Sequence, residues 1–292
     1  MTCEAKVIKD SVSVNGARLT TFQLRYWRAI HGEFMTHRVF SRNASSSRAI
    51  PVATMIEQVR TDPAGPIHWG ANQPGMQAGA ELNTWGKEAA QASWLYAAGN
   101  AANSAEKMMK LGLHKQVANR ILEPFQYISV VVTATEWTNF FELRNHPDAQ
   151  PEIQELAAAM KAAMDASRPT TLYADGWHLP YVSHDEYAVG RLDGSMLELV
   201  KASAARCARV SYLTHDGATP NVKKDLALYE RLVGSVPLHA SPIEHQAQPD
   251  IFVKEAKFGG YDGWQHPELH GNFKGWKQYR KTVEIETHKE TQ

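Results

Sequence analysis

The sequence predicts a mixed α/β fold, an α+β sandwich in which helices pack on an antiparallel sheet. The first observation is the alternation of apolar and polar residues on both sides of Asn15-Gly16, the strongest short signal of a β-hairpin. The second is apolar residues at helical spacing in two later segments, and the third is renewed alternation near the end of the chain. This order is typical of helices segregated from the strands. We expect residues 1–292 to form one domain.

The first half of the chain is predicted to contain a hairpin, a long irregular segment and a helical region. The hairpin covers residues 5–27. Residues 52–82 are rich in Gly, Pro and Asn, and long irregular segments of this kind usually serve function or partner contact. Residues 81–112 are rich in alanine and end at Gly112, which predicts one helix or a pair of helices.

The second half is predicted to contain two amphipathic helices followed by strands. Residues 151–169 begin at a proline and place apolar residues on one helix face, namely Ile153, Leu156, Ala157, Met160 and Met164. Residues 222–235 do the same with Leu226, Tyr229, Leu232 and Val233. The alternating segments 251–258 and 276–290 predict strands near the chain end.

Composition indicates a cytoplasmic protein that binds neither membrane nor nucleic acid. No run of about 18 apolar residues occurs, and the first residues lack the layout of a signal peptide. Thirty-one basic residues balance 31 acidic ones, which removes the electrostatic term on which nucleic-acid binders depend. The two cysteines are too few for a disulfide framework or a zinc cluster and fit a reducing compartment. A small anionic ligand remains compatible with this composition.

Residues 36–51, THRVFSRNASSSRAIP, concentrate arginines and short hydroxyl groups. Guanidinium groups and hydroxyls together suit phosphate oxygens. The alternative is a polar loop with helix-capping serines, since such residues commonly cap helices and form turns. The residues concerned are Arg38, Arg42, Arg48, Ser41, Ser45, Ser46 and Ser47.

Four further segments, taken together with this stretch, resemble the flavin-dependent thymidylate synthases. They are ANRILEPF (118–125), NFFELRNHPDAQPEI (139–153), CARVSY (207–212) and LHASPIEH (238–245). His37, Arg38 and Ser46 match the family's arginine-histidine-arginine and serine signature, with Thr36 in place of the leading arginine. Taken singly, each segment has a structural explanation, because an arginine among apolar residues is most often snorkelling or paired.

The matching blocks stand in an unusual order. In the family the blocks that resemble CARVSY and LHASPIEH come before the histidine-arginine signature, whereas here they come last. A cyclic shift explains this order, so the chain resembles a circular permutant of the family. Permutation is tolerated where chain termini lie close together. The terminal strands would then be neighbours in one sheet.

The resemblance implies two groups of ligand-binding residues. Ser46 and Arg48 match the residues that hold the nucleotide phosphate, with Ser47 between them, while Arg120 and Arg144 match the arginines that orient the pyrimidine and are the implied catalytic residues. Ser211 could equally be a hydroxyl of the core. Gln150 and Glu152 are interpreted as stabilising a helix start. The implied flavin-binding residues are His37, Arg38, Asn139, Ser211, His239, Ser241 and Glu244.

The resemblance also implies the reaction and its partners. The family methylates carbon 5 of deoxyuridine monophosphate (dUMP) to give dTMP, with methylenetetrahydrofolate as carbon donor, FAD as cofactor and NADPH or another reductant. Its sites are built from several subunits of a homotetramer. No side-chain nucleophile is needed, and we expect neither Cys207 nor Cys3, which lies in a terminus expected to fray, to act as one.

Departures from the family pattern leave alternatives open. Ala44, Ala49 and Thr135 replace an expected glutamate, tyrosine and arginine. The alternatives are a hydroxymethylase acting on dUMP or dCMP and a nucleotide-binding protein without catalysis. A metal-dependent hydrolase is disfavoured because the 13 histidines are scattered. Residues 127–135 favour a strand by propensity, but the resemblance implies a helix there, which we adopt as the expectation.

Overall fold

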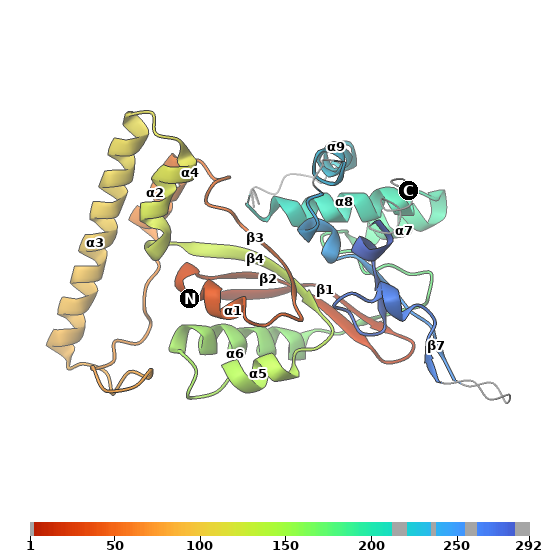
Figure 1. The fold of residues 1–292 in the computed structure, drawn as a ribbon, viewed down its shortest axis with the longest axis horizontal. Coiled ribbons are helices and arrows are strands. Elements are labelled where there is room, and N and C mark those ends of the chain that lie inside the picture. The colour runs from red at the N-terminus through yellow and green to blue at the C-terminus, as the bar shows by residue number, and fades with distance from the viewer. Residues whose placement is uncertain (1–2, 212–220, 235–237, 255–261, 284–292) are drawn as a thin grey trace.

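The computed structural model describes residues 3–211, 221–234, 238–254 and 262–283, and its centre is a five-stranded sheet (Figure 1). The strand order is β3-β4-β2-β1-β5, and every neighbouring pair is antiparallel except β1 with β5. The predicted α/β class with an antiparallel sheet is therefore confirmed, with one parallel edge strand added. The strands are β1 Glu4–Ser13, β2 Arg18–Trp27, β3 Ser41–Ala44, β4 Tyr127–Ala134 and β5 Thr170–Leu172.

The predicted hairpin is present, but the helix expected at 127–135 is not. Strands β1 and β2 meet at a turn in which Gly16 adopts φ of 83°, a conformation open to glycine. The expectation of a helix was wrong because the β-branched residues of β4 fit between two partner strands. Strand β4 pairs with β2 along its whole length and with β3 over Val130–Thr133, so propensity and pairing favour the same structure.

Helices cover both faces of the sheet (Figure 1). On one face, α6 packs Ile153, Leu156 and Met160 against the apolar side chains of β2 and β4, as its spacing predicted. On the other face, Cys207 at the end of α8 packs on Val131. The helices of these layers are α1 His31–Phe34, α5 Thr138–Arg144, α6 Pro151–Ala166, α7 His184–Asp193, α8 Met196–Ala208 and α9 Val222–Val233.

A helical unit stands at one end of the sheet (Figure 1). It comprises α2 Val52–Thr61, α3 Thr84–Lys110 and α4 Lys115–Ala118, with their own apolar core. The segment 52–82 is thus irregular only after its first ten residues, because Val52, Met55, Ile56 and Val59 form a buried helix face. The region 81–112 contains one 27-residue helix, and Gly112 beyond its end has φ of 79°.

Among the described residues, the C-terminal strands do not extend the central sheet. Two small antiparallel sheets form instead, β6 with β9 and β7 with β8. The expectation that the terminal strands are neighbours in one sheet was therefore wrong. Residues 279–283 are helical, while 255–258 and 284–290 of the predicted strands lie outside the described residues. Buried Trp276 and Phe273 pack on Leu19 and hold the small sheet against the hairpin. These strands are β6 Ala247–Pro249, β7 Phe252–Val253, β8 Gly263–Trp264 and β9 Trp276–Gln278.

Short 3-10 helices connect the larger elements. Two of them, η2 and η4, carry predicted site residues, and η3 continues α8. The 3-10 helices are η1 Arg28–Ile30, η2 Asn119–Phe125, η3 Arg209–Ser211, η4 Ser241–Glu244 and η5 Pro267–Leu269.

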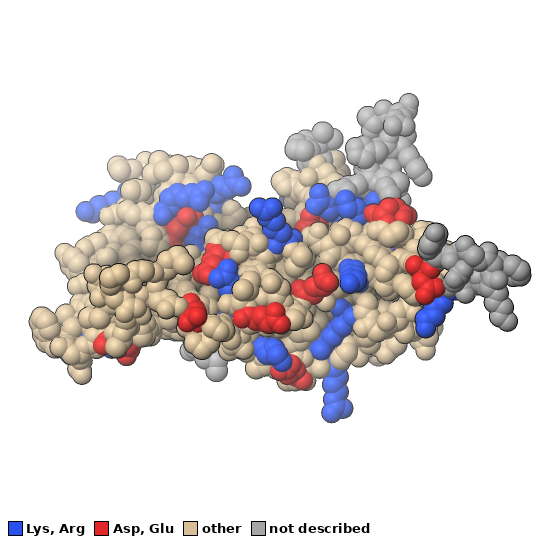
Figure 2. Space-filling view, turned by 60° about the horizontal axis from the view of Figure 1, so that its bottom comes forward, with Lys and Arg blue, Asp and Glu red and all other residues tan. Residues whose placement is uncertain are grey.

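The surface mixes both signs of charge. On the face drawn in Figure 2, basic and acidic side chains are interspersed, as the balanced composition suggests. Within the described ranges, no helix is both long enough and apolar enough to cross a bilayer.

Candidate functional site

The stretch 36–51 follows the edge of the central sheet and contacts three separate groups of residues. Its first residues meet α5, its middle residues form the edge strand β3, and its last residues meet η2. An extended strand of four residues spans roughly 13 Å, so β3 separates the residues that meet α5 from those that meet η2. The dense polar stretch therefore connects several parts of the fold.

The first group, here called the His37 group, consists of His37, Arg144, Glu33 and Thr36. Arg144 Nε donates to His37 Nε2 at 3.0 Å, and Arg144 also forms an ion pair with Glu33. The His37 ring packs beside Phe140 of α5. Burial, together with the charges of Arg144 and Arg42, lowers the pKa of His37, so its ring is neutral and accepts the guanidinium hydrogen bond.

The second group, the Glu123 group, gathers around a carboxylate of η2. Glu123 Oε1 accepts from Ser47 Oγ at 2.7 Å and from Arg120 Nη1 at 2.8 Å, and Arg28 Nη2 lies 3.2 Å away. Buried Asn119 Nδ2 donates to the carbonyl of Ser47 at 2.7 Å. Two predicted substrate residues, Ser47 and Arg120, are thus brought together by Glu123.

The third group, the Asn43 group, joins β3 to the two C-terminal blocks. Asn43 Nδ2 donates to the carbonyl of Cys207 at 2.6 Å, and its Oδ1 accepts from Ser241 Oγ at 3.2 Å. Strand β3 also lies against η3, which ends at Ser211, although the side chain of Ser211 is outside the described structure. The CARVSY and LHASPIEH blocks therefore lie beside the histidine-arginine signature in space.

The remaining residues of LHASPIEH differ in their environments. Glu244 forms an ion pair with Arg280, and its carbonyl accepts from Gln278 Nε2 at 2.9 Å. His239 is exposed, and its backbone amide donates to the carbonyl of Leu232. Of the two, only Glu244 is held in place by a side-chain contact among the described residues.

Several predicted binding residues keep their donor groups available. Arg38, Arg48 and Asn139 are exposed, and their side chains make no hydrogen bond or ion pair with the described part of the chain. Ser46 is partly buried and its Oγ accepts from the amide of Arg48 at 3.3 Å. Unpaired guanidinium and amide donors on both sides of β3 are chemically suited to the phosphates of a dinucleotide and a mononucleotide.

A hollow of about 1370 Å³ opens beside Arg144. One wall is the irregular segment with Pro66, His68 and Gln73, and the other is the end of α5 with His146. Glu152 of α6 also lines the hollow and ties the irregular segment to α6, since its Oε1 accepts from the amide of Ile67 at 2.9 Å. The predicted role of Glu152 at the helix start thus includes holding the irregular segment against α6.

The residues that differ from the family pattern make hydrogen bonds within the fold. Thr36 Oγ1 donates to the carbonyl of Glu33 at 2.7 Å, and Thr135 Oγ1 accepts from the amide of Lys274 at 3.2 Å. The carbonyl of Ala49 accepts from Lys115 Nζ at 2.8 Å. Glu123 was not among the predicted site residues, although it is the acidic residue of the quoted segment ANRILEPF, between Leu122 and Pro124.

Both cysteines are buried, and neither is placed to act as a nucleophile. Cys3 packs in the core beside α6, so the expectation of a frayed terminus was wrong for this residue. Burial, with nearby Glu155, raises the pKa of Cys3 to about 12, and burial also raises that of Cys207. Thiols held protonated in this way are inert at neutral pH.

Comparison with known protein families identifies the family of the chain. The sequence model of the family described as "Thymidylate synthase complementing protein" (Thy1) matches residues 17–170, more than half of the chain. The chain belongs to this family. The thymidylate synthase complementing proteins are the flavin-dependent thymidylate synthases whose motifs the sequence resembles, and the chain is a flavin-dependent thymidylate synthase-like enzyme. The matched range contains the His37 and Glu123 groups, whereas Cys207 and Ser241 of the Asn43 group lie beyond it.

Two solved structures are similar to part of this chain. Both are of a UMP/dUMP methylase, PolB from Streptomyces cacaoi, bound with 5-Br UMP in one case and 5-Br dUMP in the other. The first is 19% identical, with a TM-score of 0.45, and the match covers 56% of this chain and 88% of that one. The second is 15% identical, with a TM-score of 0.44, and covers 56% and 89%. No curated protein sequence matches the chain.

Proposed function

We propose that the protein transfers a one-carbon unit from methylenetetrahydrofolate to carbon 5 of dUMP and releases dTMP. Family membership supports the reaction class. The observation that carries the proposal is the 3.0 Å hydrogen bond between Arg144 and His37, because it joins an implied nucleotide residue directly to an implied flavin residue. Such a contact is expected where pyrimidine and flavin lie against each other.

In this proposal each group of residues has a distinct task. Arg48 and Ser46 bind the nucleotide phosphate, while Arg120 and Arg144 face the pyrimidine and stabilise negative charge that develops on it. Glu123 and Glu33 fix the two guanidinium groups in orientation, since each forms an ion pair with one of them.

The flavin-binding residues would come from both parts of the chain. When bound and reduced by NADPH or another reductant, FAD would supply the hydride that completes the methyl group. The donors of Arg38 and Asn139 fit its polar groups, and neutral His37 keeps its ring beside Phe140. The residues proposed to hold it are His37, Arg38, Asn139, Ser211, His239, Ser241 and Glu244.

A product analysis tests this proposal. The purified protein is incubated with FAD, methylenetetrahydrofolate and dUMP, with and without NADPH or dithionite, and the nucleotides are weighed by mass spectrometry. We expect dTMP only with reductant. An unchanged dUMP mass in every mixture, with flavin visibly bound, would contradict catalysis and support a binding role.

A second candidate function is hydroxymethylation of dUMP or dCMP. The small side chains of Ala44 and Ala49 stand where the family has a glutamate and a tyrosine, and the side chain of Arg120 is 53% exposed. Water therefore has room near the predicted pyrimidine position. The same incubation is run with dUMP and, separately, with dCMP in its place, and a product heavier than the methylated nucleotide by one oxygen would identify this activity.

We also propose that the chain is a circular permutant of its family. The motif blocks keep their cyclic order in the sequence. Asn43 supports the proposal, since it bonds to Cys207 and Ser241, which lie in the two blocks that are displaced in sequence. Proximity in space with displacement in sequence is what a permutation of one fold produces.

The last part of the proposal is a homotetramer. Trp85 and Tyr96 lie about three turns apart on α3 and are 78% and 74% exposed, so this helix presents large apolar side chains to solvent. We expect light scattering to give about four times the chain mass of 32.6 kDa. Tyr96→Arg should lower the measured mass, whereas Glu88→Lys, a charge change at another exposed position of α3, should not. A monomer in the unmodified protein would contradict this part.

A further inference from the structure

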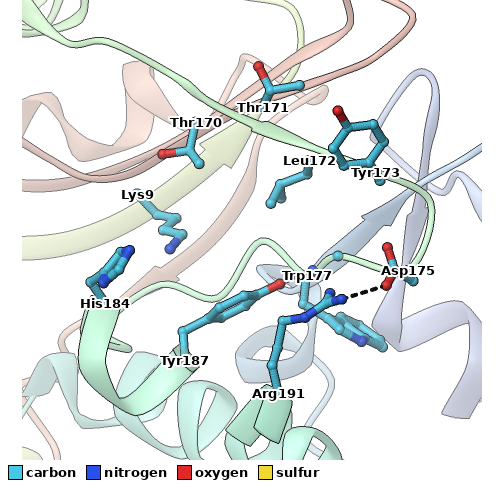
Figure 3. Close-up of a pocket in the computed structure, with 11 residues that line it drawn as sticks. Lys9, Thr170, Thr171, Leu172, Tyr173, Asp175, Trp177, His184, Tyr187 and Arg191 are labelled. Atoms are coloured by element: carbon cyan, nitrogen blue, oxygen red, sulfur yellow. Dashed lines mark hydrogen bonds and ion pairs between the residues drawn. The ribbon is translucent and has the colours of Figure 1, made fainter. Parts of the chain in front are cut away.

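A second cavity, of about 450 Å³, lies away from every predicted site residue (Figure 3). It is bounded by β1, by β5 with the loop that follows it, and by α7. Figure 3 shows the side chain of Lys9 extending toward the space between Thr170 and Tyr187. A volume of this size is in the range of small-molecule sites.

A β-bulge aims Lys9 into this cavity. In the pairing of β1 with β2, Val7 lies opposite Phe22 and Lys9 lies opposite Thr21, so Ile8 is an extra residue. Paired residues of antiparallel strands share a face, and Thr21 faces His178, to which its hydroxyl bonds at 2.8 Å. Without the bulge, Lys9 would pair with Thr20, whose side chain bonds to Asp10 on the opposite face.

The ammonium group of Lys9 has no ionic partner among the described residues. Its Nζ lies over the ring of Tyr187, 5.5 Å from the ring centroid. Asp175, the carboxylate that lines the cavity, is already paired with Arg191 at 2.8 Å. Asp10, next to Lys9 in sequence, binds Arg18 on the other face of the sheet.

Burial lowers the pKa of Lys9, which shows that the protein environment disfavours its charge. A partly buried ammonium without a counter-ion costs stability, so a packing role alone would be served better by an apolar side chain. An anion that enters the cavity would supply the missing partner.

Aromatic side chains form part of the walls of the cavity. The backbone amide of Trp177 donates to the hydroxyl of Tyr187 at 2.8 Å and so fixes the Tyr187 side chain, while the Trp177 ring packs edge-on against Tyr279. Leu172 and Tyr173 add apolar surface, and Thr170 adds a hydroxyl. Fixed aromatic side chains bind planar ligands at little cost in conformational entropy.

We propose that this cavity binds a small aromatic anion, with its ring against Trp177 and Tyr187 and its phosphate or carboxylate on Lys9. The shared chemistry is a planar ring bearing one anionic group. This site is independent of the dUMP and flavin residues, and the proposal does not depend on the reaction proposed above.

Binding of model compounds to the full chain tests the proposal. The probes are 1-naphthyl phosphate and 1-naphthoate, with 1-naphthalenemethanol as the neutral ring and inorganic phosphate as the ringless anion, measured by calorimetry. We expect at least one aryl anion to bind, and both single-feature probes to bind at least about tenfold more weakly. Comparison of the affinities of the two aryl anions shows whether the cavity prefers a phosphate or a carboxylate. Failure of both aryl anions to bind would overturn the proposal.

Substitutions of Lys9 assign the binding to this cavity. Lys9→Met should weaken the aryl anion at least about tenfold, whereas Lys9→Arg, which keeps the charge, should retain most of the affinity. FAD and dUMP affinities should stay unchanged in Lys9→Met. Equal aryl-anion binding by Lys9→Met, or loss of FAD or dUMP binding in it, would overturn the assignment.

Thermal unfolding of the ligand-free protein separates a binding role from a structural one. Lys9→Met should raise the Tm, because an unpaired, partly buried charge is replaced by an apolar side chain of similar length. The matched control is Lys6→Met on the same strand, where the exposed lysine should change the Tm little. A lowered Tm in Lys9→Met alone would show that Lys9 stabilises the fold and would overturn the inference.

Discussion

Replacing Arg144 with alanine should lower the affinity for dUMP by about 10- to 100-fold, the range expected for the loss of charge-assisted hydrogen bonds. The substitution removes the contact on His37 Nε2 and leaves the carboxylate of Glu33 without its ion pair. Because His37 loses its partner, we also expect FAD to bind more weakly. Titration of the two ligands by calorimetry and flavin fluorescence measures both effects.

Two comparisons make this result specific. Arg120→Ala should weaken the binding of dUMP but leave the affinity for FAD unchanged, because the guanidinium of Arg120 contacts Glu123 and not His37. Arg168→Ala removes an exposed arginine that makes no ion pair with the described residues, and should change the affinity for neither ligand. If Arg144→Ala binds both ligands as the unmodified protein does, the His37 group has no part in the site.

A direct readout of the same contact is the titration of His37. The charge of Arg144 is one of the causes that lower the pKa of His37, after burial. In Arg144→Ala this pKa should rise toward its ordinary value, as followed by NMR of the imidazole protons.

The largest loss of stability should follow substitution of Asp225 by asparagine. Asp225 is completely buried. Its carboxylate accepts a hydrogen bond from Arg206 Nε at 2.8 Å and forms an ion pair with Arg209 Nη1 at 2.6 Å. Arg206 also binds Glu186, so this ion cluster holds α7, α8 and α9 together. Removing one partner of a buried ion cluster typically costs about 3–5 kcal/mol, which urea denaturation would measure as a lower free energy of unfolding.

A more exposed ion pair between α8 and α9 provides the control. Lys201 of α8 and Glu230 of α9 lie 3.1 Å apart, and the Glu230 side chain is 62% exposed. Glu230→Gln should therefore cost less than about 1 kcal/mol. Equal small effects for the two substitutions would show that the buried cluster does not hold these helices. Since α8 ends beside Asn43, a loosened cluster should also displace the CARVSY block from β3.

Local sequence patterns predicted the elements whose stabilising contacts are near in sequence. The hairpin required only alternation and an Asn-Gly turn, and α6 required only a proline start and apolar residues at helical spacing. The strand at 127–134 was also encoded locally by β-branched residues, and the expectation failed because the family resemblance was preferred to propensity. The family was recognisable because its motifs are short segments with polar residues at characteristic positions.

Contacts between distant segments could not be read from the sequence. Periodicity does not reveal that Arg144 reaches His37, that Glu123 gathers Ser47 and Arg120, or that Asn43 bonds to residues more than 160 positions away. These pairings depend on the path of β3 along the sheet edge, and on how α5, η2 and η4 pack beside it. The same holds for Lys9, where a single extra residue in β1 reverses the face of the sheet to which the side chain points. Local patterns specify most of the helices and strands and all of the chemical groups, whereas packing between distant segments selects which groups meet.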